Sequence, residues 1–522
     1  DQDTIVGGMA HMPQLQRLLK DQGVTFANGF VHTPICCPSR SSILSGRYLH
    51  NGGALNNTVD GNCYGQEWKN DMEQNTFATL LQNLVGYRTS YAGKYLNQYG
   101  IPGSGCFENG TECDRVPPGW DRWLGLVGNS KYYNYEVVVQ KDKRKRIEHH
   151  GHNYEKDYFP DLVANFTVES IQTFATDKER PFLAVVAWPT AHAPYTPAPW
   201  SEHRYDDLTA LRTPNYNASR QSLQSKHWMM RWLAPIDNET EFWINEVYQN
   251  RTEGLLSVDH HIQVFIDALK RYNMYDNTYI LYTSDNGWQL GQHRLSYDKR
   301  QLYENDIRVP FVLTGPGIPH NVTYNNIVLN IDIAPTIVDM ATKGWSTFGS
   351  RSDMMNKPES ETLCKKQLGH ALDQMDGASF LPSFAGKMKE RMTISLDDND
   401  HYVPRKDFLI SYHGHGYAQC DNFWSCPGPP SPKDYHCGDW SNNTYHCIRT
   451  IQVDGEDSIY CRFMDEEHFG EYYDLTKDPW QLNNTYSSLS MNEQMRYEKR
   501  LEELRTCQGK TCRHKTLPAY TE

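Results

Sequence analysis

Short apolar segments alternate with segments of helical spacing along the first three fifths of the chain, and this alternation restricts the fold class. Strands are predicted at 24–30, 88–92, 182–188, 279–283 and 309–314, and helices at 13–22, 75–84 and 255–269. The continuous apolar runs at 182–188 and 279–283 are typical of strands buried on both faces. The pattern therefore predicts an α/β fold with a large mixed, mostly parallel sheet between helices. In such sheets, functional sites form beyond the carboxyl ends of the strands.

The pattern changes towards the C-terminus. Polar sequence of low periodicity occupies 342–376. Beyond it, strands are predicted at 408–412, 444–451, 458–463 and 471–473, followed by a helix at 491–506. We therefore expect a catalytic domain at 1–370 and a smaller C-terminal α+β domain at 377–522, built on an antiparallel sheet. No run of eighteen apolar residues is present, so no membrane span is predicted.

Cysteines and glycosylation motifs indicate the secretory pathway, with a lysosomal or secreted protein as the expectation. The chain has thirteen cysteines, and the seven between Cys420 and Cys512 predict disulfides, including a local Cys507–Cys512 pair. With Cys36 set aside, the other twelve can all pair, but the sequence leaves their connectivity open. Nine Asn-x-Ser/Thr motifs are candidate glycosylation sites: Asn56, Asn109, Asn165, Asn217, Asn238, Asn250, Asn321, Asn442 and Asn483.

The balance of charge is acidic, with a formal net charge of −13. Such a surface repels polyanions at neutral pH, so nucleic acid is not an expected partner, and the 21 histidines reduce the repulsion in an acidic compartment. One basic run, at 141–146, departs from this balance. Its two interpretations are a solvated loop and a contact for a sulfated glycan.

The segment 36–46 reads Cys-Cys-Pro-Ser-Arg-Ser-Ser-Ile-Leu-Ser-Gly. Cys-Cys-Pro alone would favour a pair of buried or disulfide-bonded cysteines beside a turn, because free cysteine is often a small buried hydrophobe. The longer Cys-x-Pro-Ser-Arg pattern with its Leu-x-Gly end is specific enough to reverse that preference. Cys36 and Arg40 are therefore candidate functional residues, and the family resemblance described below implies a role for each.

Other segments offer polar groups just after predicted strands. Asp285 and Asn286 precede Gly287, and their oxygens suit Ca²⁺ or, less well, Mg²⁺, although an ordinary Asx turn would explain the same residues. Asp1 and Asp3 can add carboxylates from the start of the sequence. Three basic side chains complete the set, each with a structural explanation as the alternative: Lys94 in Gly-Lys-Tyr, His192 in Ala-His-Ala-Pro and Lys299 in Asp-Lys-Arg.

The order Asp…Cys-x-Pro-Ser-Arg…Gly-Lys…His-x-Pro…Asp-Asn-Gly…Lys…Arg-Val-Pro resembles the type I, formylglycine-dependent sulfatase family over nearly the whole chain. Within the family, the chain resembles N-acetylglucosamine-6-sulfatases and the related heparan endosulfatases. It lacks the long basic insertion of the endosulfatases, which favours an exo-acting enzyme. The closer likeness rests on the segments 36–40, 93–99, 117–120, 129–135, 225–228 and 298–304.

The resemblance implies an alkaline-phosphatase-like sulfatase fold and a role for each matching residue. Cys36 would become formylglycine, and Ca²⁺ would be bound by formylglycine-36 together with Asp1, Asp285 and Asn286. A second aspartate of the family motif would lie just upstream of Asp1, so we expect the sequence to begin at a mature or incomplete N-terminus. Arg40 would hold the aldehyde hydrate.

The remaining roles concern the substrate. By the same resemblance, Lys94, His192 and Lys299 would contact sulfate, and His192 or Lys299 would protonate the leaving oxygen. Many family members carry a histidine two or three residues after the Gly-Lys lysine. Asn97 takes one of those positions here and becomes a substrate-binding candidate. His227, in Lys-His-Trp, is a second, with packing as its alternative role.

The function implied is removal of the 6-sulfate from N-acetylglucosamine residues of heparan or keratan sulfate. The alternatives are a sulfatase for another small ester, such as an aryl sulfate or a plant glucosinolate, and a non-catalytic glycoprotein derived from a sulfatase. The expected partners are the sulfated substrate and, during maturation, the formylglycine-generating enzyme. No membrane partner is expected, and a homodimer is one option for the oligomeric state.

Overall fold

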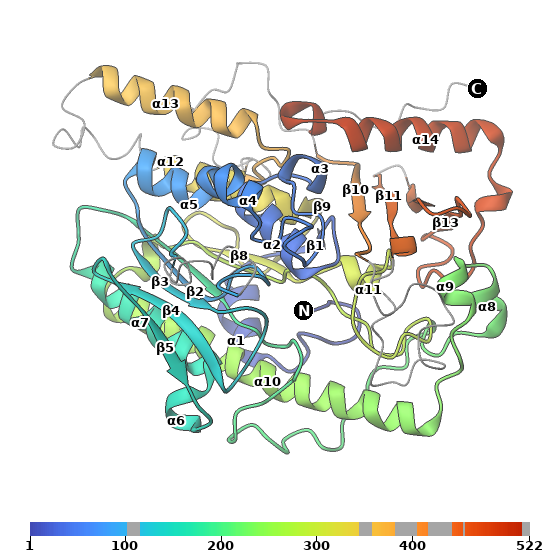
Figure 1. Ribbon diagram of the computed structural model, residues 1–522, viewed down its shortest axis with the longest axis horizontal. Helices are drawn as coiled ribbons and strands as arrows, with labels where there is room; N and C mark the ends of the chain where they lie inside the picture. Colours follow the sequence, from blue (N-terminus) through green and yellow to red (C-terminus); the bar gives the residue numbers. More distant parts are fainter. Residues whose placement is uncertain (102–114, 344–357, 382–403, 416–440, 453–454, 514–522) are drawn as a thin grey trace.

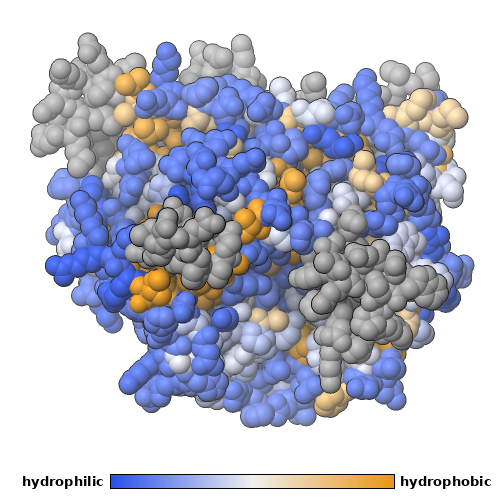
Figure 2. All heavy atoms as spheres, viewed as in Figure 1, coloured by the Kyte–Doolittle hydropathy of each residue, from blue (hydrophilic) through white to orange (hydrophobic). Residues whose placement is uncertain are grey.

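The computed structural model describes residues 1–101, 115–343, 358–381, 404–415, 441–452 and 455–513. Figure 1 shows two mixed sheets in the middle of the N-terminal part, with helices on both sides, and an antiparallel sheet formed by the C-terminal part. Figure 2 shows that the visible face is largely hydrophilic, with small hydrophobic patches. Among the described helices, none is both long and apolar enough to cross a membrane.

The first sheet has the strand order β7-β8-β1-β9. β1 is parallel to β9 and antiparallel to β8, which is antiparallel to β7. The predicted strands at 24–30, 279–283 and 309–314 are all present. β7 is only partly buried, because it lies at the edge of the sheet rather than inside it. The strands are β1 (Gly23–Phe30), β7 (Ile280–Thr283), β8 (Phe311–Thr314) and β9 (Val322–Leu329).

The second sheet has the order β5-β4-β3-β2-β6, and β2 is parallel to both of its neighbours. β3, β4 and β5 form antiparallel pairs, so the sheets contain more antiparallel pairing than a mostly parallel sheet would. β6 is an edge strand and is partly buried, whereas its sequence predicts burial on both faces. The strands are β2 (Arg88–Lys94), β3 (Arg122–Leu126), β4 (Tyr135–Lys141), β5 (Arg144–His150) and β6 (Phe182–Ala187).

The two faces of this second sheet are covered by different helices. Side chains at alternate positions, such as Val137 and Val139, pack against α7 (Phe159–Ala175). Trp123 and other residues of the opposite face pack towards α5 (Phe77–Leu80) and α12 (Ile333–Lys343). This is the two-residue periodicity of a strand buried on both sides.

The longest helix, α10 (Asn238–Arg271), includes the predicted segment 255–269 and packs against α7. Asp237 caps its N-terminus by accepting a hydrogen bond from the Thr240 N–H at 2.8 Å. The predicted helices at 13–22 and 75–84 are present but interrupted, since α1 (Pro13–Leu15) and α5 each continue into π-helical turns, at Gln16–Lys20 and Leu81–Val85. Shorter helices are α3 (Leu49–Gly52), α4 (Gln66–Asn70), α6 (Tyr154–Asp157), α8 (Arg220–Gln224), α9 (Trp228–Arg231) and α11 (Glu304–Ile307).

The C-terminal sheet is antiparallel, in the order β10-β11-β12-β13, and every predicted strand is present. Its strands are β10 (Asp407–Tyr412), β11 (Tyr445–Ile451), β12 (Asp457–Phe463) and β13 (Gly470–Asp474). The predicted final helix is α14 (Met491–Thr506), which begins with a capping box between Ser490 and Glu493. The segment 342–376, which has little periodicity, also contains a helix, α13 (Pro358–Asp373).

One hydrophobic cluster contains residues from both parts of the chain. Phe30 of β1 and Phe408 of β10 have ring centroids 5.0 Å apart, and the Ser411 N–H donates to the His32 carbonyl at 2.8 Å. Arg449 of β11 contacts Glu304 of α11. The domain boundary near residue 370 stays a prediction, and the C-terminal sheet shares a core with the first sheet.

Three disulfides lie in the described part of the chain. The predicted Cys507–Cys512 pair is confirmed. Cys447 and Cys461 are joined across β11 and β12, and Cys37 is bonded to Cys63. Cys36 and Cys364 are free thiols. The other five cysteines lie outside the described residues: Cys106, Cys113, Cys420, Cys426 and Cys437.

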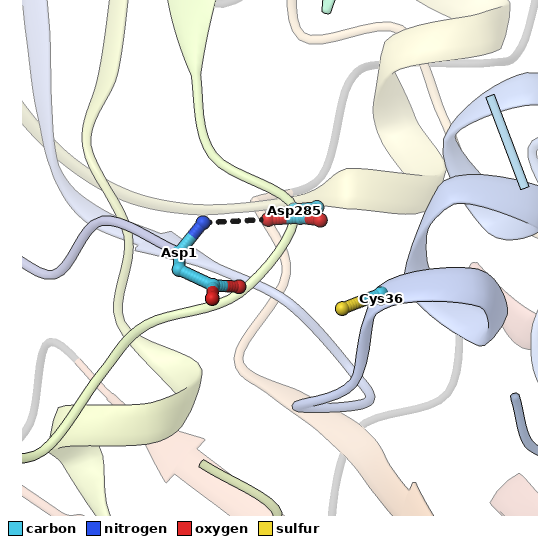
Figure 3. Close-up of side chains that lie close together, drawn as sticks. All are labelled: Asp1, Cys36 and Asp285. Carbon is cyan, nitrogen blue, oxygen red and sulfur yellow. Dashed lines mark hydrogen bonds and ion pairs between the residues drawn. The ribbon is translucent and has the colours of Figure 1, made fainter. Parts of the chain in front are cut away.

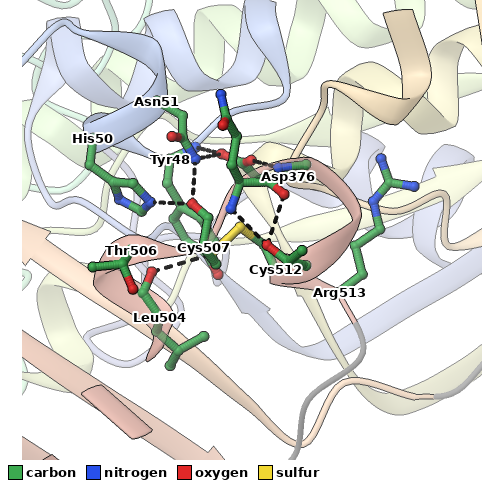
Figure 4. Close-up of a disulfide and its surroundings, with 12 residues drawn as sticks. Tyr48, His50, Asn51, Asp376, Leu504, Thr506, Cys507, Cys512 and Arg513 are labelled. Carbon is green, nitrogen blue, oxygen red and sulfur yellow. Dashed lines mark hydrogen bonds between the residues drawn. A yellow bond between two sulfur atoms is a disulfide. The ribbon is translucent and has the colours of Figure 1, made fainter. Parts of the chain in front are cut away.

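The Cys507–Cys512 segment attaches the end of the described chain to α3 (Figure 4). The Cys507 carbonyl accepts hydrogen bonds from the His50 ring and the Asn51 amide, both at 2.9 Å. The Asp376 carboxylate accepts from the Gly509 N–H at 2.7 Å and from Asn51 at 2.9 Å. Asp376 therefore links α3, which follows the predicted nucleophile helix, to the C-terminal segment.

Candidate active site

Three residues from distant segments of the chain lie close together: Asp1, Cys36 and Asp285 (Figure 3). One candidate ligand atom from each lies within 4.8 Å of the others. Cys36 is the first residue of α2 (Cys36–Ser45), and Asp285 follows β7. All three are buried, so the structure brings together the residues that the sequence analysis assigned to one metal site.

The local structure of α2 explains most of the Cys-Cys-Pro-Ser-Arg segment. Pro38 lies in the first turn of the helix, where no N–H is needed, and Gly46 ends the helix with a left-handed φ of 71°. Ser39 accepts a hydrogen bond from the Asn330 amide at 2.9 Å. Cys37 is fixed by its disulfide to Cys63. These contacts hold the first turn of α2 in place and direct Cys36 towards Asp1 and Asp285.

Arg40 lies one turn after Cys36 and crosses the site. Its Nε donates to Asp285 Oδ2 at 2.8 Å, and its Nη1 donates to the Lys94 carbonyl at 2.8 Å. The guanidinium thereby connects the loop after β7 with the end of β2. Both contacts are hydrogen bonds that a single lysine ammonium would not reproduce in the same geometry.

Lys94 and Lys299 add two buried positive charges. Lys299 Nζ donates to Asp1 Oδ2 at 2.7 Å, and Lys94 Nζ donates to Ser130 Oγ at 3.3 Å. Burial lowers the pKa of Lys94 to about 8, although Cys36 opposes the shift. Burial raises the pKa of the Cys36 thiol, but Lys299, Lys94 and a hydrogen bond with His192 outweigh it, so the pKa lies well below its ordinary value. The site is therefore built to stabilise negative charge at position 36.

His192 comes from the loop after β6. Its Nδ1 donates to the Ala193 carbonyl at 2.8 Å, so Nδ1 carries the proton and Nε2 is an acceptor. Nε2 lies 4.0 Å from Asp1 Oδ2, and the ring is hydrogen-bonded to Cys36. Burial, followed by the charges of Lys299 and Lys94, lowers the pKa of His192 to about 4.

Asn286 supplies an additional oxygen to this cluster. Its amide Nδ2 donates to Asp1 Oδ1 at 2.8 Å, and its Oδ1 is buried without a hydrogen-bond partner among the described residues. An unpartnered buried oxygen beside two carboxylates fits a hard divalent cation, which prefers oxygen ligands. Asp3 does not join the cluster, because its carboxylate accepts hydrogen bonds from the Ile5 and Val6 N–H groups.

The two substrate-binding candidates lie in different surroundings. Asn97 follows β2 and is buried, and its Oδ1 has no partner within the described ranges. His227 stacks on Phe463 of β12 with ring centroids 3.8 Å apart, and its Nε2 lies 2.9 Å from Asp465 Oδ2. Packing against the C-terminal sheet accounts for the burial of His227, and a substrate role for either residue stays a prediction.

Sequence reasoning missed Arg251 and Trp288. Arg251 Nη1 donates to the Ala191 carbonyl at 2.7 Å, and Nη2 donates to the Asp1 carbonyl at 2.8 Å. It thus positions both the His192 loop and the first residue of the chain. Trp288 contacts two cations, with its ring centroid 4.4 Å from the Arg251 guanidinium and 4.8 Å from Lys299 Nζ. No local motif marks Arg251, which is one polar residue in a long amphipathic helix.

Comparison with known proteins agrees with this arrangement. A family model described as Sulfatase matches residues 3–343. The chain is 38% identical over 520 residues to an N-acetylglucosamine-6-sulfatase of Capra hircus, an alignment that covers 98% of this chain and 83% of the relative. It is 40% identical over 341 residues to the extracellular sulfatase SULF-1 homolog of Drosophila melanogaster, covering 65% of this chain and 29% of that protein.

A solved structure also resembles the chain, with a TM-score of 0.63 and 21% identity over 96% of this chain and 93% of the other. That protein was solved in complex with its substrate D-glucosamine-2-N,6-O-disulfate. At this identity the likeness concerns the fold alone. Together with the family match, it confirms the alkaline-phosphatase-like fold predicted from the order of the motifs.

Proposed function

We propose that this chain, which belongs to the sulfatase family, removes the 6-sulfate from N-acetylglucosamine residues of heparan or keratan sulfate. Hydrolysis of sulfate esters follows from the family. The sugar specificity is supported by the 38% identity to an N-acetylglucosamine-6-sulfatase, which extends over 98% of the chain and so includes the C-terminal sheet. The observation that carries the proposal is that Asp1, Cys36 and Asp285 lie close together. The buried side chains of Lys94 and Lys299 lie beside them.

The chemistry depends on two groups that the encoded residues alone do not supply. We infer that the formylglycine-generating enzyme oxidises Cys36 to formylglycine and that Ca²⁺ is held by residue 36, Asp1, Asp285 and Asn286. The hydrated aldehyde supplies a hydroxyl nucleophile and a second hydroxyl for release of sulfate, and the cation supplies positive charge. The unpartnered Asn286 Oδ1 supports this ligand set.

The protein side chains would bind, orient and protonate. Arg40, held by Asp285 and the Lys94 carbonyl, orients the group at position 36. Lys94 and Lys299 stabilise negative charge that develops on the sulfate oxygens, because they are buried where water does not screen them. His192 Nε2 and Lys299 Nζ are placed to hold the proton that the departing sugar oxygen takes up.

The secretory pathway, ending in the lysosome or outside the cell, fits both the disulfides and the likeness to an extracellular sulfatase. Eight of the nine glycosylation motifs have asparagines that are exposed or partly exposed on helices and loops outside the site, and the ninth, Asn109, lies outside the described residues. Five of them are exposed in the described structure: Asn165, Asn238, Asn321, Asn442 and Asn483.

Two measurements test the proposal. A peptide that includes residues 30–47 should show the mass lost when one oxygen replaces a sulfur and two hydrogens at Cys36. Purified protein should then release sulfate from N-acetylglucosamine-6-sulfate faster than from an aryl sulfate or a glucosinolate, and Cys36→Ala should be inactive. Cleavage of only the aryl sulfate or the glucosinolate would refute the sugar specificity, whereas no cleavage by aldehyde-bearing protein would refute the catalytic role.

A further inference from the structure

The basic run at 141–146 comprises the last residue of β4, the two-residue turn and the first three residues of β5. β5 is the outermost strand of its sheet in the described part of the chain, and the side chains from Asp142 to Ile147 are exposed. Five of the six residues at 141–146 are lysine or arginine in a chain whose net charge is −13. The hairpin therefore concentrates positive charge on one edge of an otherwise acidic protein.

Some of this charge is paired within the hairpin and with α7. Lys141 forms an ion pair with Glu169, and Arg146 forms one with Glu148. Lys143 and Arg144 have no acidic partner among the residues that the structure describes, and both project into solvent. These two cations remain available to an external anion.

The turn of the hairpin contains an unfavourable residue. Asp142 and Lys143 have φ angles of 49° and 63°, as the two-residue turn of such a hairpin requires. The second position strongly favours glycine, because a side chain in the left-handed region costs about 1 kcal/mol. A lysine at this position is not explained by the stability of the hairpin, and backbone outliers of this kind suggest a functional residue.

The hairpin is separated from the reacting centre but continuous with it. Ser130, which contacts Lys94 Nζ, lies in the loop that leads into β4. β4 runs away from that loop for seven residues, roughly 20 Å at the rise of a strand, before the turn at Lys143. β5 then returns antiparallel to β4, and its last residue, His150, pairs with Tyr135 at the end of β4 that lies nearer that loop, so a linear ligand that extends from the site can lie along β5.

We propose that the β4–β5 hairpin binds the polymeric part of a sulfated glycan whose terminal sugar is in the active site. The inference rests on the proposed function, since it assigns the polymer as the substrate class. A monosaccharide in the site cannot reach the basic turn of the hairpin across about 20 Å. The hairpin consequently changes the affinity for polymer and leaves the chemistry at Cys36 unchanged.

A charged edge strand also has a purely structural explanation. Lysine and other charged residues on edge strands prevent strands of different molecules from pairing. Either sign of charge gives this protection, whereas only positive charge attracts a sulfated polymer. Reversal of the charge, rather than its removal, therefore separates the two explanations.

The experiment compares Lys143→Glu/Arg144→Glu with Lys270→Glu/Arg271→Glu, which makes the same change of charge at the exposed end of α10. Immobilised heparin is the probe, at pH 7. Wild-type protein and the α10 variant should elute above about 0.15 M NaCl. The hairpin variant should elute at lower salt, and its KM for heparan sulfate should rise roughly tenfold. Its kcat/KM for N-acetylglucosamine-6-sulfate should equal that of wild type.

Lys143→Gly is an independent test of the hairpin, because it removes one positive charge and relieves the backbone strain at the turn. It should weaken heparin retention while the melting temperature stays equal or rises. The proposal is overturned if both double variants lose retention equally, if hairpin reversal leaves retention and polymer KM unchanged, or if it lowers monosaccharide cleavage in parallel. Wild-type protein that cleaves neither substrate would refute the proposed function, while heparin retention would still test the hairpin.

Discussion

Glu304→Gln should destabilise the contact between the two parts of the chain by about 3 kcal/mol. Glu304 accepts hydrogen bonds from Arg449 Nε at 2.7 Å and from Arg308 Nε at 2.8 Å. Burial raises its pKa, but Arg449 and Arg308 lower it further, to about 2 from an ordinary value of 4.5. A difference of about 2.5 pKa units corresponds to about 3 kcal/mol. Loss of one partner of a buried ion pair gives a similar figure, about 3–5 kcal/mol.

The sign of the pH dependence follows from the lowered pKa. The ionised form of Glu304 is favoured in the folded protein, so its contribution is complete above pH 4.5 and is lost as pH falls towards 2. The difference in unfolding free energy between wild type and Glu304→Gln should be about 3 kcal/mol at pH 6 and about 1 kcal/mol at pH 3. The contact therefore persists at the acidic pH of a lysosome.

Urea unfolding at 25 °C, followed by tryptophan fluorescence at pH 6 and pH 3, measures this difference. Glu241→Gln is the matched control, because Glu241 also pairs with an arginine, Arg212, at 2.7 Å, but 43% and 34% of the two side chains are exposed. That variant should lose less than about 1 kcal/mol. The reasoning fails if Glu304→Gln costs no more than Glu241→Gln at pH 6, or if its cost is the same at both pH values.

Three further perturbations test the site and its supports. Arg40→Lys keeps the positive charge but loses one of the two hydrogen bonds that Arg40 donates. Its kcat should therefore fall about 10²-fold while its formylglycine content stays unchanged. Activity near that of wild type would contradict the role assigned to Arg40. Chelation of divalent cations should abolish activity and lower the melting temperature, and added Ca²⁺ should restore both. The melting temperature of Asp285→Asn should not change when Ca²⁺ is added. If chelation leaves the wild-type protein unaffected, the proposed metal site is wrong. Replacing Cys447 and Cys461 together by alanine should cost about 3 kcal/mol, measured by urea unfolding, because their loop is closed over 14 residues; an unchanged midpoint would contradict this estimate.

The candidate site could be predicted where a motif follows a strand. Four site residues lie at or just after the end of a strand or at the start of a helix: Cys36, Lys94, His192 and Asp285. A local sequence pattern therefore also predicts that these side chains lie at one side of the sheets. The order of the motifs then identified them as one set. Arg251 escaped notice because its contacts are with backbone carbonyls that only the folded chain brings near.

For the fold, too, local features could be predicted and features that depend on distant contacts could not. The antiparallel C-terminal strands were found because each is a short apolar run between turns. The partial burial of β6 and β7 could not be predicted, because apolar composition does not distinguish a central strand from an edge strand covered by helices. The Cys37–Cys63 bond likewise depends on a loop closure that spacing alone leaves open.

The link between α3 and the C-terminal segment has a consequence for the time course of synthesis. His50 and Cys507, which meet in the folded protein, are 457 positions apart. At about 5–20 residues per second, the ribosome needs roughly 25–90 s to make the partner of the segment that follows Cys36. Throughout that interval α3 lacks its final anchor, and for about the first half of it Asp285 and Lys299, which enclose Cys36, have not yet been made. The order of synthesis thus leaves Cys36 accessible to a modifying enzyme at least until Asp285 and Lys299 have been made, after which the folded site buries it.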